Sequence, residues 1–330
     1  MAAFGHARFL PRTEGAVRRR RTYSDPVHSG QYPAPRHTVA HLSDTHLLAR
    51  DQRQFGKVDP EAGLVLALDR LTNLATPPEA IVITGDLTDL GEPAAYARLR
   101  ELIEPAAAAM HAEVIWVMGN HDERLAFSTG LFGAPSEAPH DRIHDLAGLR
   151  LVVLDTTVPG WHHGVLDDEQ LAWLGDVLAT PAAHGTVLAM HHPPVPMPLD
   201  PASVAIELFG QERLAEVVAG TDVRAILAGH LHYSVSTTFA GIPVSVASAS
   251  CYTIDLAAPD RYYSGVDGHQ AISLVHLYDE GAGGIAGAPV VHTAVPLAAA
   301  PEVVGYPASV ALELETLSAE QRHDLLSRKG

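Results

Sequence analysis

Hydrophobic and polar positions alternate in blocks between residues 37 and 298. Short β-branched runs lead into polar loops and then into stretches of helical periodicity, which is typical of an α/β fold. The runs predict strands at 38–42, 80–84, 114–118, 149–154, 186–190 and 224–228. The periodic stretches predict helices at 60–74, 93–103, 167–178 and 207–218. Because the strand runs are almost continuously hydrophobic, we expect strands that are covered on both faces.

The pattern changes after residue 233. Strand-like runs at 234–239, 242–247, 271–278 and 289–295 follow one another without helices, which predicts an antiparallel portion or a second sheet. The segment 251–270 lacks clear periodicity, and a loop of this length is usually functional or flexible. Its tyrosines, Tyr252, Tyr262 and Tyr263, are expected to line substrate, to form a dimer contact or simply to pack, and the pattern favours none of the three.

The charge is unevenly distributed along the chain. The chain has 39 acidic and 22 basic residues and a net charge of −17, which disfavours a nucleic-acid polymer as partner. The first 36 residues hold seven arginines, and we expect a basic, disordered extension over 1–36 because Pro, Gly and Arg cannot bury a core. The main domain is expected over 37–298. A C-terminal extension is expected over 299–330, with a short helix capped by Ser318 and Gln321.

The chain shows no targeting segment or membrane span by its pattern. The arginines are not followed by an apolar stretch, and a run of about 18 apolar residues is absent from the sequence. The single cysteine, Cys251, excludes an intramolecular disulfide and fits a reducing compartment. We therefore expect a soluble cytoplasmic protein. Envelope association through the C-terminal extension stays an open alternative.

Histidine is the unusual component, with 20 residues. Five strand runs end in polar motifs: Ser43-Asp44-Thr45-His46, Gly85-Asp86, Gly119-Asn120-His121-Asp122, His191-His192-Pro193 and Gly229-His230-Leu231-His232. The carboxyl ends of parallel strands face one crevice, so residues far apart in sequence are expected to converge there. The spacing i, i+2 within Asp44/His46 and His230/His232 places both members of each pair on one side of an extended segment.

The convergent side chains predict a dinuclear metal centre. Seven are candidate ligands: Asp44, His46, Asp86, Asn120, His191, His230 and His232. Seven ligands are too many for one tetrahedral zinc and about right for two ions that share a carboxylate. Carboxylate, amide and imidazole without thiolate suit Mn, Fe, Zn or Co.

The ordered motifs resemble those of the calcineurin-like metallophosphoesterase superfamily, whose pattern is D-x-H, G-D, G-N-H-D/E, a later H, and G-H-x-H. The surrounding residues, in the ranges 41–46, 85–96, 116–122 and 224–233, are similar to the bacterial class III cyclic nucleotide phosphodiesterases, in particular those of actinobacteria that hydrolyse 3′,5′-cyclic AMP. The resemblance covers about residues 37–298. It implies a four-layered αββα sandwich, a pair of ions such as Fe and Mn, and a homodimer.

Carried over by position, the resemblance implies two ligand sets. The first set is Asp44, His46, Asp86 and His232, and the second set is Asp86, Asn120, His191 and His230, so that Asp86 bridges the two ions. His121 matches the family's active-site histidine, and His162 matches a histidine that approaches the substrate phosphate. Asn120 also lies at the substrate-binding position. Trp161 departs from the pattern, because close members carry a histidine there.

The chemistry expected from this resemblance is hydrolysis of a cyclic nucleotide, such as cyclic AMP to AMP, by in-line attack of a hydroxide held between two ions. His121 either donates a proton to the leaving oxygen or only binds phosphate, and Asp122 is expected to hold the His121 tautomer. A glycerophosphodiester or a 2′,3′-cyclic nucleotide is the alternative substrate.

Other members of the superfamily, and a role in binding alone, fit this sequence less well. Asp89 stands where purple acid phosphatases have a tyrosine, and Leu90 where phosphoprotein phosphatases have an arginine. The acidic body lacks the basic surface of a repair nuclease. A binding scaffold that has lost its ligands is also disfavoured, because all seven are present.

Overall fold

The computed structural model describes residues 32–49, 52–258, 260–298, 300–305, 310, 314 and 316–327. Residues 35–298 form one compact unit, which carries both large sheets. The basic extension expected over 1–36 lies outside the described residues as far as residue 31. In the other unit, helix α7 (Ala319–Ser327) begins with a capping box in which the Ser318 hydroxyl accepts from the Gln321 amide at 3.1 Å. The Gln321 side chain accepts from the Ser318 amide at 2.8 Å in return.

The first sheet has five strands in the order β15-β14-β1-β2-β3. The strands are β1 (His37–Leu42), β2 (Ala80–Thr84), β3 (Glu113–Val117), β14 (Ala271–Leu277) and β15 (Val290–Pro296). The pairs β1/β2 and β2/β3 are parallel, whereas β14 pairs antiparallel with both β1 and β15. This mixed order agrees with the antiparallel portion expected after residue 233.

The second sheet has six strands in the order β10-β11-β9-β7-β5-β4. The strands are β4 (Arg142–Leu146), β5 (Leu149–Leu154), β7 (Thr186–Met190), β9 (Val223–Ala228), β10 (Val235–Phe239) and β11 (Ile242–Val246). The inner strands β5, β7, β9 and β11 run parallel, and the two edge strands are antiparallel. Two small pairs complete the set: β6 (Gly164–Val165) with β8 (Leu208–Phe209), and β12 (Thr253–Ile254) with β13 (Gly265–Val266).

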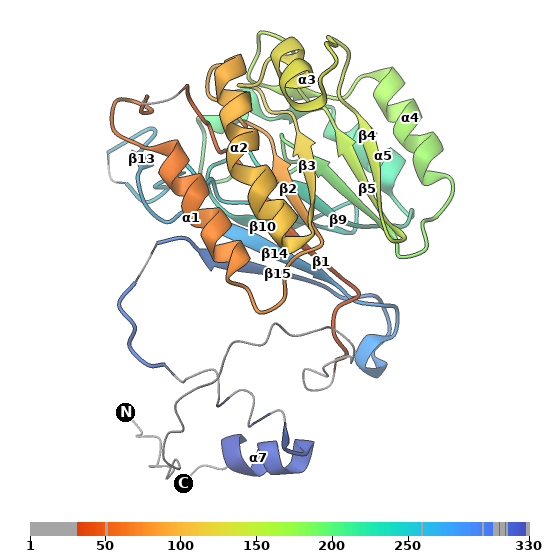
Figure 1. Cartoon of the computed structure of the whole chain (residues 1–330). Coiled ribbons are helices and arrows are strands. Elements are labelled where there is room, and N and C mark those ends of the chain that lie inside the picture. Colours follow the sequence, from red (N-terminus) through yellow and green to blue (C-terminus); the bar gives the residue numbers. More distant parts are fainter. Residues whose placement is uncertain are drawn as a thin grey trace. The chain divides into compact units, whose positions relative to one another are not determined.

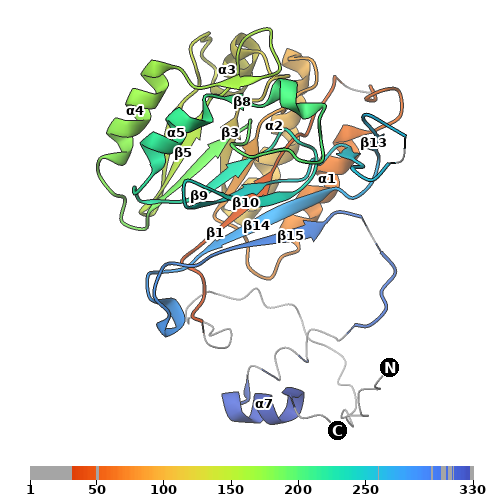
Figure 2. The same ribbon diagram turned by 180° about the vertical axis from the view of Figure 1, so that it is seen from behind.

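The sheets and helices stack in four layers. Helices α1 (Pro60–Thr72), α2 (Pro93–Met110) and α3 (Arg124–Phe132) cover the outer face of the first sheet. Helices α4 (Asp168–Leu178) and α5 (Gln211–Val218) cover the second sheet, as the two opposite views show (Figures 1 and 2). A third apolar cluster, which includes Val82, Val117, Val153 and Leu227, joins the inner faces of the two sheets. The expected αββα sandwich is therefore confirmed.

Two helices differ by more than two residues from the sequence-based boundaries. A proline normally interrupts a helix, so an end near Ile103 was expected, but α2 continues past Pro105 because Ala107 and Met110 pack into the core. Helix α5 begins later than expected, since Gly210 has φ 71° and the residues before it form β8. The predicted α4 begins as its sequence indicates, with Asp167 in a reciprocal capping box.

Candidate metal centre

All seven predicted ligands meet at the carboxyl ends of strands from both sheets. Asp44 and His46 follow β1, Asp86 follows β2 and Asn120 follows β3. From the second sheet, His191 follows β7, and the pair His230 and His232 follows β9. The predicted convergence thus unites two sheets that face each other, because each sheet alone supplies only part of the set.

The first ligand set is tightly clustered. The ligand atoms of Asp44, His46, Asp86 and His232 all lie within 4.8 Å of one another. His46 Nε2 lies 3.1 Å from His232 Nε2 and 3.3 Å from Asp86 Oδ2. His232 Nε2 lies 3.5 Å from Asp44 Oδ1. All four side chains are buried, so their polar atoms face one another and not water.

The second ligand set shares Asp86 and is centred on His191. His191 Nε2 lies 3.4 Å from Asp86 Oδ2 and 3.1 Å from Asn120 Oδ1. His230 Nδ1 lies 3.2 Å from the same His191 nitrogen. Asp86 therefore lies between the two sets, at the position where a bridging carboxylate is expected.

Hydrogen bonds on the far side of each imidazole fix which nitrogen can bind a cation. His46 Nδ1 donates to Asp89 Oδ1 at 2.9 Å, and His232 Nδ1 donates to the Tyr252 carbonyl at 2.9 Å. His191 Nδ1 donates to the Thr84 carbonyl at 2.7 Å, and His230 Nε2 donates to the Ile206 carbonyl at 2.9 Å. Carbonyl and carboxylate oxygens only accept, so the hydrogen is assigned to these nitrogens.

This assignment leaves two pairs of imidazole lone pairs that point at each other, His46 with His232 and His191 with His230. Two lone pairs about 3 Å apart repel unless a positive charge lies between them. The neighbouring carboxylates of Asp44 and Asp86 add negative charge to the same buried space. The donor set therefore fits one cation at each pair, in agreement with the expected dinuclear centre.

The pKa values show which side chains of the metal-free centre carry charge. Burial lowers the pKa of His230 and His232 to about 3. Burial acts in the same direction on His46 and His191, but the hydrogen bond and charge of Asp86 outweigh it and raise their pKa values to about 10 and about 9. Burial opposes ionisation of Asp86, yet His191 and His46 hold its pKa well below the usual range. The surroundings of Asp86 therefore favour positive charge at His46 and His191.

The backbone at the ligands is strained. Five of the seven have positive φ in the left-handed region: Asp44 (52°), His46 (42°), Asp86 (48°), His230 (74°) and His232 (58°). Such conformations cost on the order of 1 kcal/mol or more each for a residue with a Cβ, and they persist where the surroundings enforce them. Glycines allow the close approach: a Cβ at Gly119 would lie 2.0 Å from the Asp86 amide, and one at Gly229 would lie 1.8 Å from Ser43 Oγ.

His121 lies at the open side of the first set. Its ring is 4.7 Å from the ring of His46, and its backbone amide donates to Asp86 Oδ1 at 2.8 Å. Its Nδ1 donates to the Asp89 carbonyl at 2.9 Å, which leaves Nε2 free to exchange a proton. The side chain is 34% exposed, so a substrate can reach it.

Asp122 differs from its expected role as the partner of His121. Its buried carboxylate accepts from the backbone amides of Leu87, Thr88 and Gly119 and from the Tyr96 hydroxyl. The three amides belong to the loops after β2 and β3, and Tyr96 lies in α2, so Asp122 joins the two loops that carry Asp86 and Asn120 and ties them to this helix. The group that faces His121 Nδ1 is Asp89, through its carbonyl.

His162 lies beside Asn120, as the resemblance implied. Its Nδ1 is 2.9 Å from Asn120 Nδ2, so the amide donates to it, and its ring is 5.3 Å from that of His121. The His162 carbonyl accepts from His192 Nε2 at 3.1 Å, which anchors this exposed loop to the site. The adjacent Trp161 is 63% exposed and packs against His163 at 5.6 Å.

Some groups at the site carry no sequence signal. The carbonyls of Thr84, Ile206 and Tyr252 orient three imidazoles, and a carbonyl is common to every residue.

Two further side chains, His192 and Asp89, could have been found from the sequence, because His192 follows His191 directly and Asp89 lies three residues after Asp86. His192 is fully buried behind His191 and His230, and Asp89 contacts both His46 and His121.

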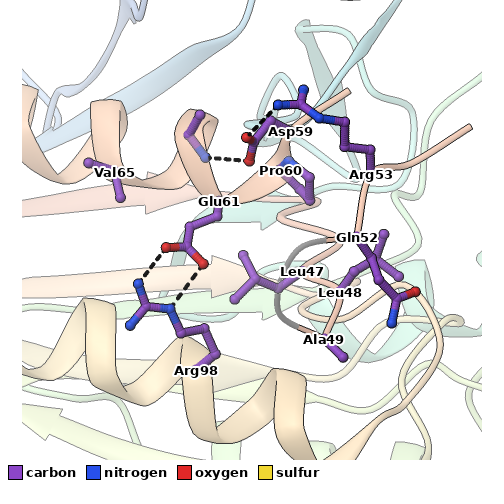
Figure 3. A pocket seen from close by; sticks show the side chains of 11 residues that line it. Leu47, Leu48, Ala49, Gln52, Arg53, Asp59, Pro60, Glu61, Val65 and Arg98 are labelled. Carbon is purple, nitrogen blue, oxygen red and sulfur yellow. Dashed lines mark hydrogen bonds and ion pairs between the residues drawn. The ribbon is translucent and has the colours of Figure 1, made fainter. Parts of the chain in front are cut away.

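A cavity of about 610 Å³ lies next to the site, where Leu47 and Leu48 follow His46. Its charged groups pair with one another: Arg98 Nε donates to Glu61 at 2.9 Å, and Arg53 donates to Asp59 at 3.3 Å (Figure 3). These pairs neutralise the charged side chains that line the cavity.

The fold and the donor set together define a metallophosphoesterase. A family model described as calcineurin-like phosphoesterase matches residues 37–234, and the chain belongs to this family. Within the described part of the chain, no helix is both long and apolar enough to cross a membrane.

Several relatives are similar over most of their length. A cAMP/cGMP dual specificity phosphodiesterase of Mycobacterium tuberculosis is 52% identical, over 82% of this chain and 83% of its own. A probable cyclic nucleotide phosphodiesterase of Rhodococcus erythropolis is 50% identical, over 83% of this chain and 88% of its own. A glycerophosphodiester phosphodiesterase of Enterobacter lignolyticus is 27% identical, over 73% of this chain and 95% of its own. Among solved structures, a dimetal phosphatase from Danio rerio has a TM-score of 0.56 at 15% identity over 80% of this chain and 97% of its own, which supports the fold alone.

Proposed function

We propose that this chain is a dinuclear metal-dependent phosphodiesterase that hydrolyses cyclic nucleotides, opening cyclic AMP to AMP. The observation that carries the proposal is the pair of facing imidazole lone pairs, His46 with His232 and His191 with His230, around the shared Asp86. The names of the relatives that are half identical to this chain support the substrate class.

The metal ligands are assigned in two sets, Asp44, His46, Asp86 and His232, and Asp86, Asn120, His191 and His230. Two bound cations supply Lewis acidity, which activates a water and neutralises phosphate charge. Fe and Mn are the proposed pair, with Zn, Co or two Mn ions as alternatives that the same ligands accept.

The remaining residues bind phosphate and move a proton. Asn120 and His162 orient the phosphate from one side of the centre. The Asn120 amide donates to His162 Nδ1, which places the ring hydrogen of His162 on Nε2 and leaves that nitrogen to donate to the phosphate. His121 delivers a proton to the leaving oxygen from Nε2, while its Nδ1–H stays bonded to the Asp89 carbonyl. Asp122 acts indirectly, since its carboxylate holds the loops that carry these groups.

A turnover screen of the Mn-loaded protein tests this function. The panel contains a 3′,5′-cyclic nucleotide, a 2′,3′-cyclic nucleotide, a glycerophosphodiester and a phosphomonoester, and we expect the 3′,5′-cyclic nucleotide to have the highest kcat/KM. Preference for the glycerophosphodiester would favour the function named for the relative that is 27% identical. Dominant turnover of the monoester would refute the diesterase assignment.

The variant Asn120→Ala tests the ligand assignment with bis-p-nitrophenyl phosphate, which does not depend on base recognition. We expect at least about a tenfold loss of kcat/KM, because the variant lacks both a metal ligand and a phosphate contact. Unchanged hydrolysis by the metal-replete variant would refute the dinuclear mechanism.

The boundaries of the catalytic domain (37–298), the two extensions, the homodimer and the cytoplasmic location stay predictions. Sedimentation velocity of the full chain tests the homodimer. Cell fractionation of the full chain and of a variant that ends at residue 298 tests the location, including envelope contact through the C-terminal extension.

A further inference from the structure

Three aromatic side chains form a wall on the first-set side of the metal centre. We call Phe55, Tyr252 and Tyr263 the aromatic wall. The Tyr252 ring lies 4.4 Å from the ring of His232 and 6.4 Å from that of His46. Phe55 meets Tyr252 edge to face at 5.4 Å, and the Tyr252 and Tyr263 hydroxyls are 3.2 Å apart. The wall therefore begins at the ligand rings and extends outward.

Phe55 is the exposed end of this wall. It is 73% exposed, and its backbone has φ 51°, in the region where glycine is favoured. A large aromatic ring contributes little to folding when it is so exposed, and the left-handed backbone adds a cost on the order of 1 kcal/mol. Folding thus favours neither the ring nor its conformation, which points to a contact made by something outside the chain.

The loop that carries Phe55 is attached to the metal centre. The side chain of Gln54 is buried and donates to Asp89 Oδ1 at 2.8 Å, and the same oxygen accepts from His46 Nδ1 at 2.9 Å. Gln54 and Val58 exchange two backbone hydrogen bonds, each of 3.0 Å, which close the turn. Phe55 is thereby held at a fixed position relative to His46.

Tyr252 and Tyr263 are held from the other side by the segment 251–270. Strands β12 and β13 pair antiparallel within this segment, and both views place β13 beside α1, just after the loop of Phe55 (Figures 1 and 2). Thr253 Oγ1 donates to the Gly268 carbonyl at 2.6 Å, and Gln270 donates to the Cys251 carbonyl at 2.8 Å. Tyr252 is only 8% exposed, whereas Tyr263 is 49% exposed.

We propose that the aromatic wall binds the base of the cyclic nucleotide, with Phe55 as the stacking residue and Tyr252 as the positioning residue behind it. This inference rests on the proposed function, and it assigns recognition of the base to a part of the site that the metal chemistry does not use. A base offers a flat π-face, and stacking on an exposed aromatic ring is tolerant of base identity. The wall thus selects nucleotides over diesters without a base.

Trp161 is the alternative candidate for the residue that stacks on the base. It is exposed as well, but it reaches the centre through His162 and packs on His163, which in turn packs on Phe209. The aromatic wall instead contacts the rings of the first ligand set directly, and its loop shares Asp89 with His46. These contacts favour Phe55 as the residue that meets the base.

The experiment compares cyclic AMP with methyl ribofuranoside 3′,5′-cyclic phosphate, which has the same ring phosphate but no base. We expect Phe55→Ala to raise the KM for cyclic AMP about tenfold and to leave kcat within about twofold. The KM for the substrate without a base should not change. Phe55→Tyr keeps a stacking ring and should restore the KM for cyclic AMP, and Trp161→Ala is the matched control in the loop of His162.

Three outcomes would overturn the proposal: no change of KM in Phe55→Ala, an equal change for both substrates, or a base-specific loss in Trp161→Ala alone. If the wild-type protein hydrolysed neither substrate, the proposed function would fail, but the wall would still be tested by calorimetric titration with cyclic AMP. In that titration, about tenfold weaker binding to Phe55→Ala than to wild type supports the wall, and equal binding refutes it.

Discussion

The two ligand sets differ in how many carboxylates they contain and in the groups that accept hydrogen bonds from the far nitrogens of their histidines. The first set contains two carboxylates, Asp44 and Asp86, and a third carboxylate, Asp89, accepts from the far nitrogen of His46. The second set has Asp86 as its one carboxylate, and the far nitrogens of its two histidines donate to neutral carbonyls.

This difference in charge predicts a difference in affinity. A carboxylate behind an imidazole raises the basicity of the ligating nitrogen more than a carbonyl does, and an extra carboxylate ligand adds direct attraction. Behind the second set lies His192, whose pKa is lowered well below the usual range by burial and by the neighbouring His230. His192 therefore stays neutral and, unlike the Asp89 carboxylate, contributes no charge to its set. We therefore expect the first set to bind its cation more tightly, or to prefer the more highly charged ion.

The largest expected effect is that of Asp86→Ala, because Asp86 alone belongs to both sets. Without it, both cation sites lose a charge at once, and kcat/KM for cyclic AMP should fall at least about 1000-fold. Metal content, measured by plasma emission spectrometry after gel filtration, should fall from two ions per chain to less than one.

Asp44→Asn is the matched variant, since Asp44 belongs only to the first set. It should retain about one ion per chain, because the ligands of the second set are intact. Equal metal loss in the two variants would show that the sets are not separate sites, and the comparison between them would fail.

A smaller effect separates the residues behind the ligands. Asp89→Asn should weaken one ion about 10–100-fold and leave the other unchanged, because among the proposed metal ligands His46 is the one that donates to Asp89. His192→Gln removes a buried neighbour of the second set that bears no charge, and both affinities should stay within about threefold. Titration against a competing fluorescent chelator measures both affinities. Weakening of both ions by Asp89→Asn would contradict the assignment of Asp89 to the first set.

The fold was largely predictable from the sequence because its strands are buried on both faces. The predicted strands at 80–84, 149–154 and 186–190 coincide with β2, β5 and β7. The edge strand β4 was missed because Ile143 lies on the same exposed face as Asp145 and Leu146 is its one buried residue, so it lacks the hydrophobic run of a covered strand. The end of α2 was misplaced because tertiary packing of Met110 outweighs the local effect of Pro105.

The candidate site was predictable to the level of which side chains meet, but not of how they are oriented. The motifs after the strands brought Asp44, Asn120 and His230 to one place by topology alone. The partner of His121 could not be predicted, because Asp122 accepts from the amides of Leu87 and Gly119. The Asp89 carbonyl accepts from His121 Nδ1 instead. Such hydrogen bonds to the backbone depend on the path of the chain and carry no residue-specific signal.

The smallest expected effect is a pH dependence that both sets share. The folded-state pKa values of His46 and His191 are raised to about 10 and about 9, so their protonation stabilises the folded metal-free protein fully below the unfolded value near 6.5. This stability is lost progressively as the pH rises from about 6.5, and the loss is complete once the pH has passed the folded-state values of about 9 and 10. The pKa values of His230 and His232 are lowered to about 3, so these two groups cost stability as the pH falls below 6.5. Urea unfolding of the metal-free protein should therefore show maximum stability near pH 6.5, with a decline on both the acid and the alkaline side.

Bound cations should remove the alkaline part of this profile, because a ligating histidine must be neutral and the cation replaces the proton beside Asp86. Each pKa unit corresponds to about 1.4 kcal/mol, so the loss between pH 7 and 10 is large enough to measure in the metal-free protein. His46→Gln removes the group of the first set and should leave only the decline that His191 causes between about pH 6.5 and 9. Identical profiles for His46→Gln and His191→Gln would show that the different surroundings of the two sets do not give His46 and His191 different pKa values. The contrast between the sets would then be confined to metal affinity.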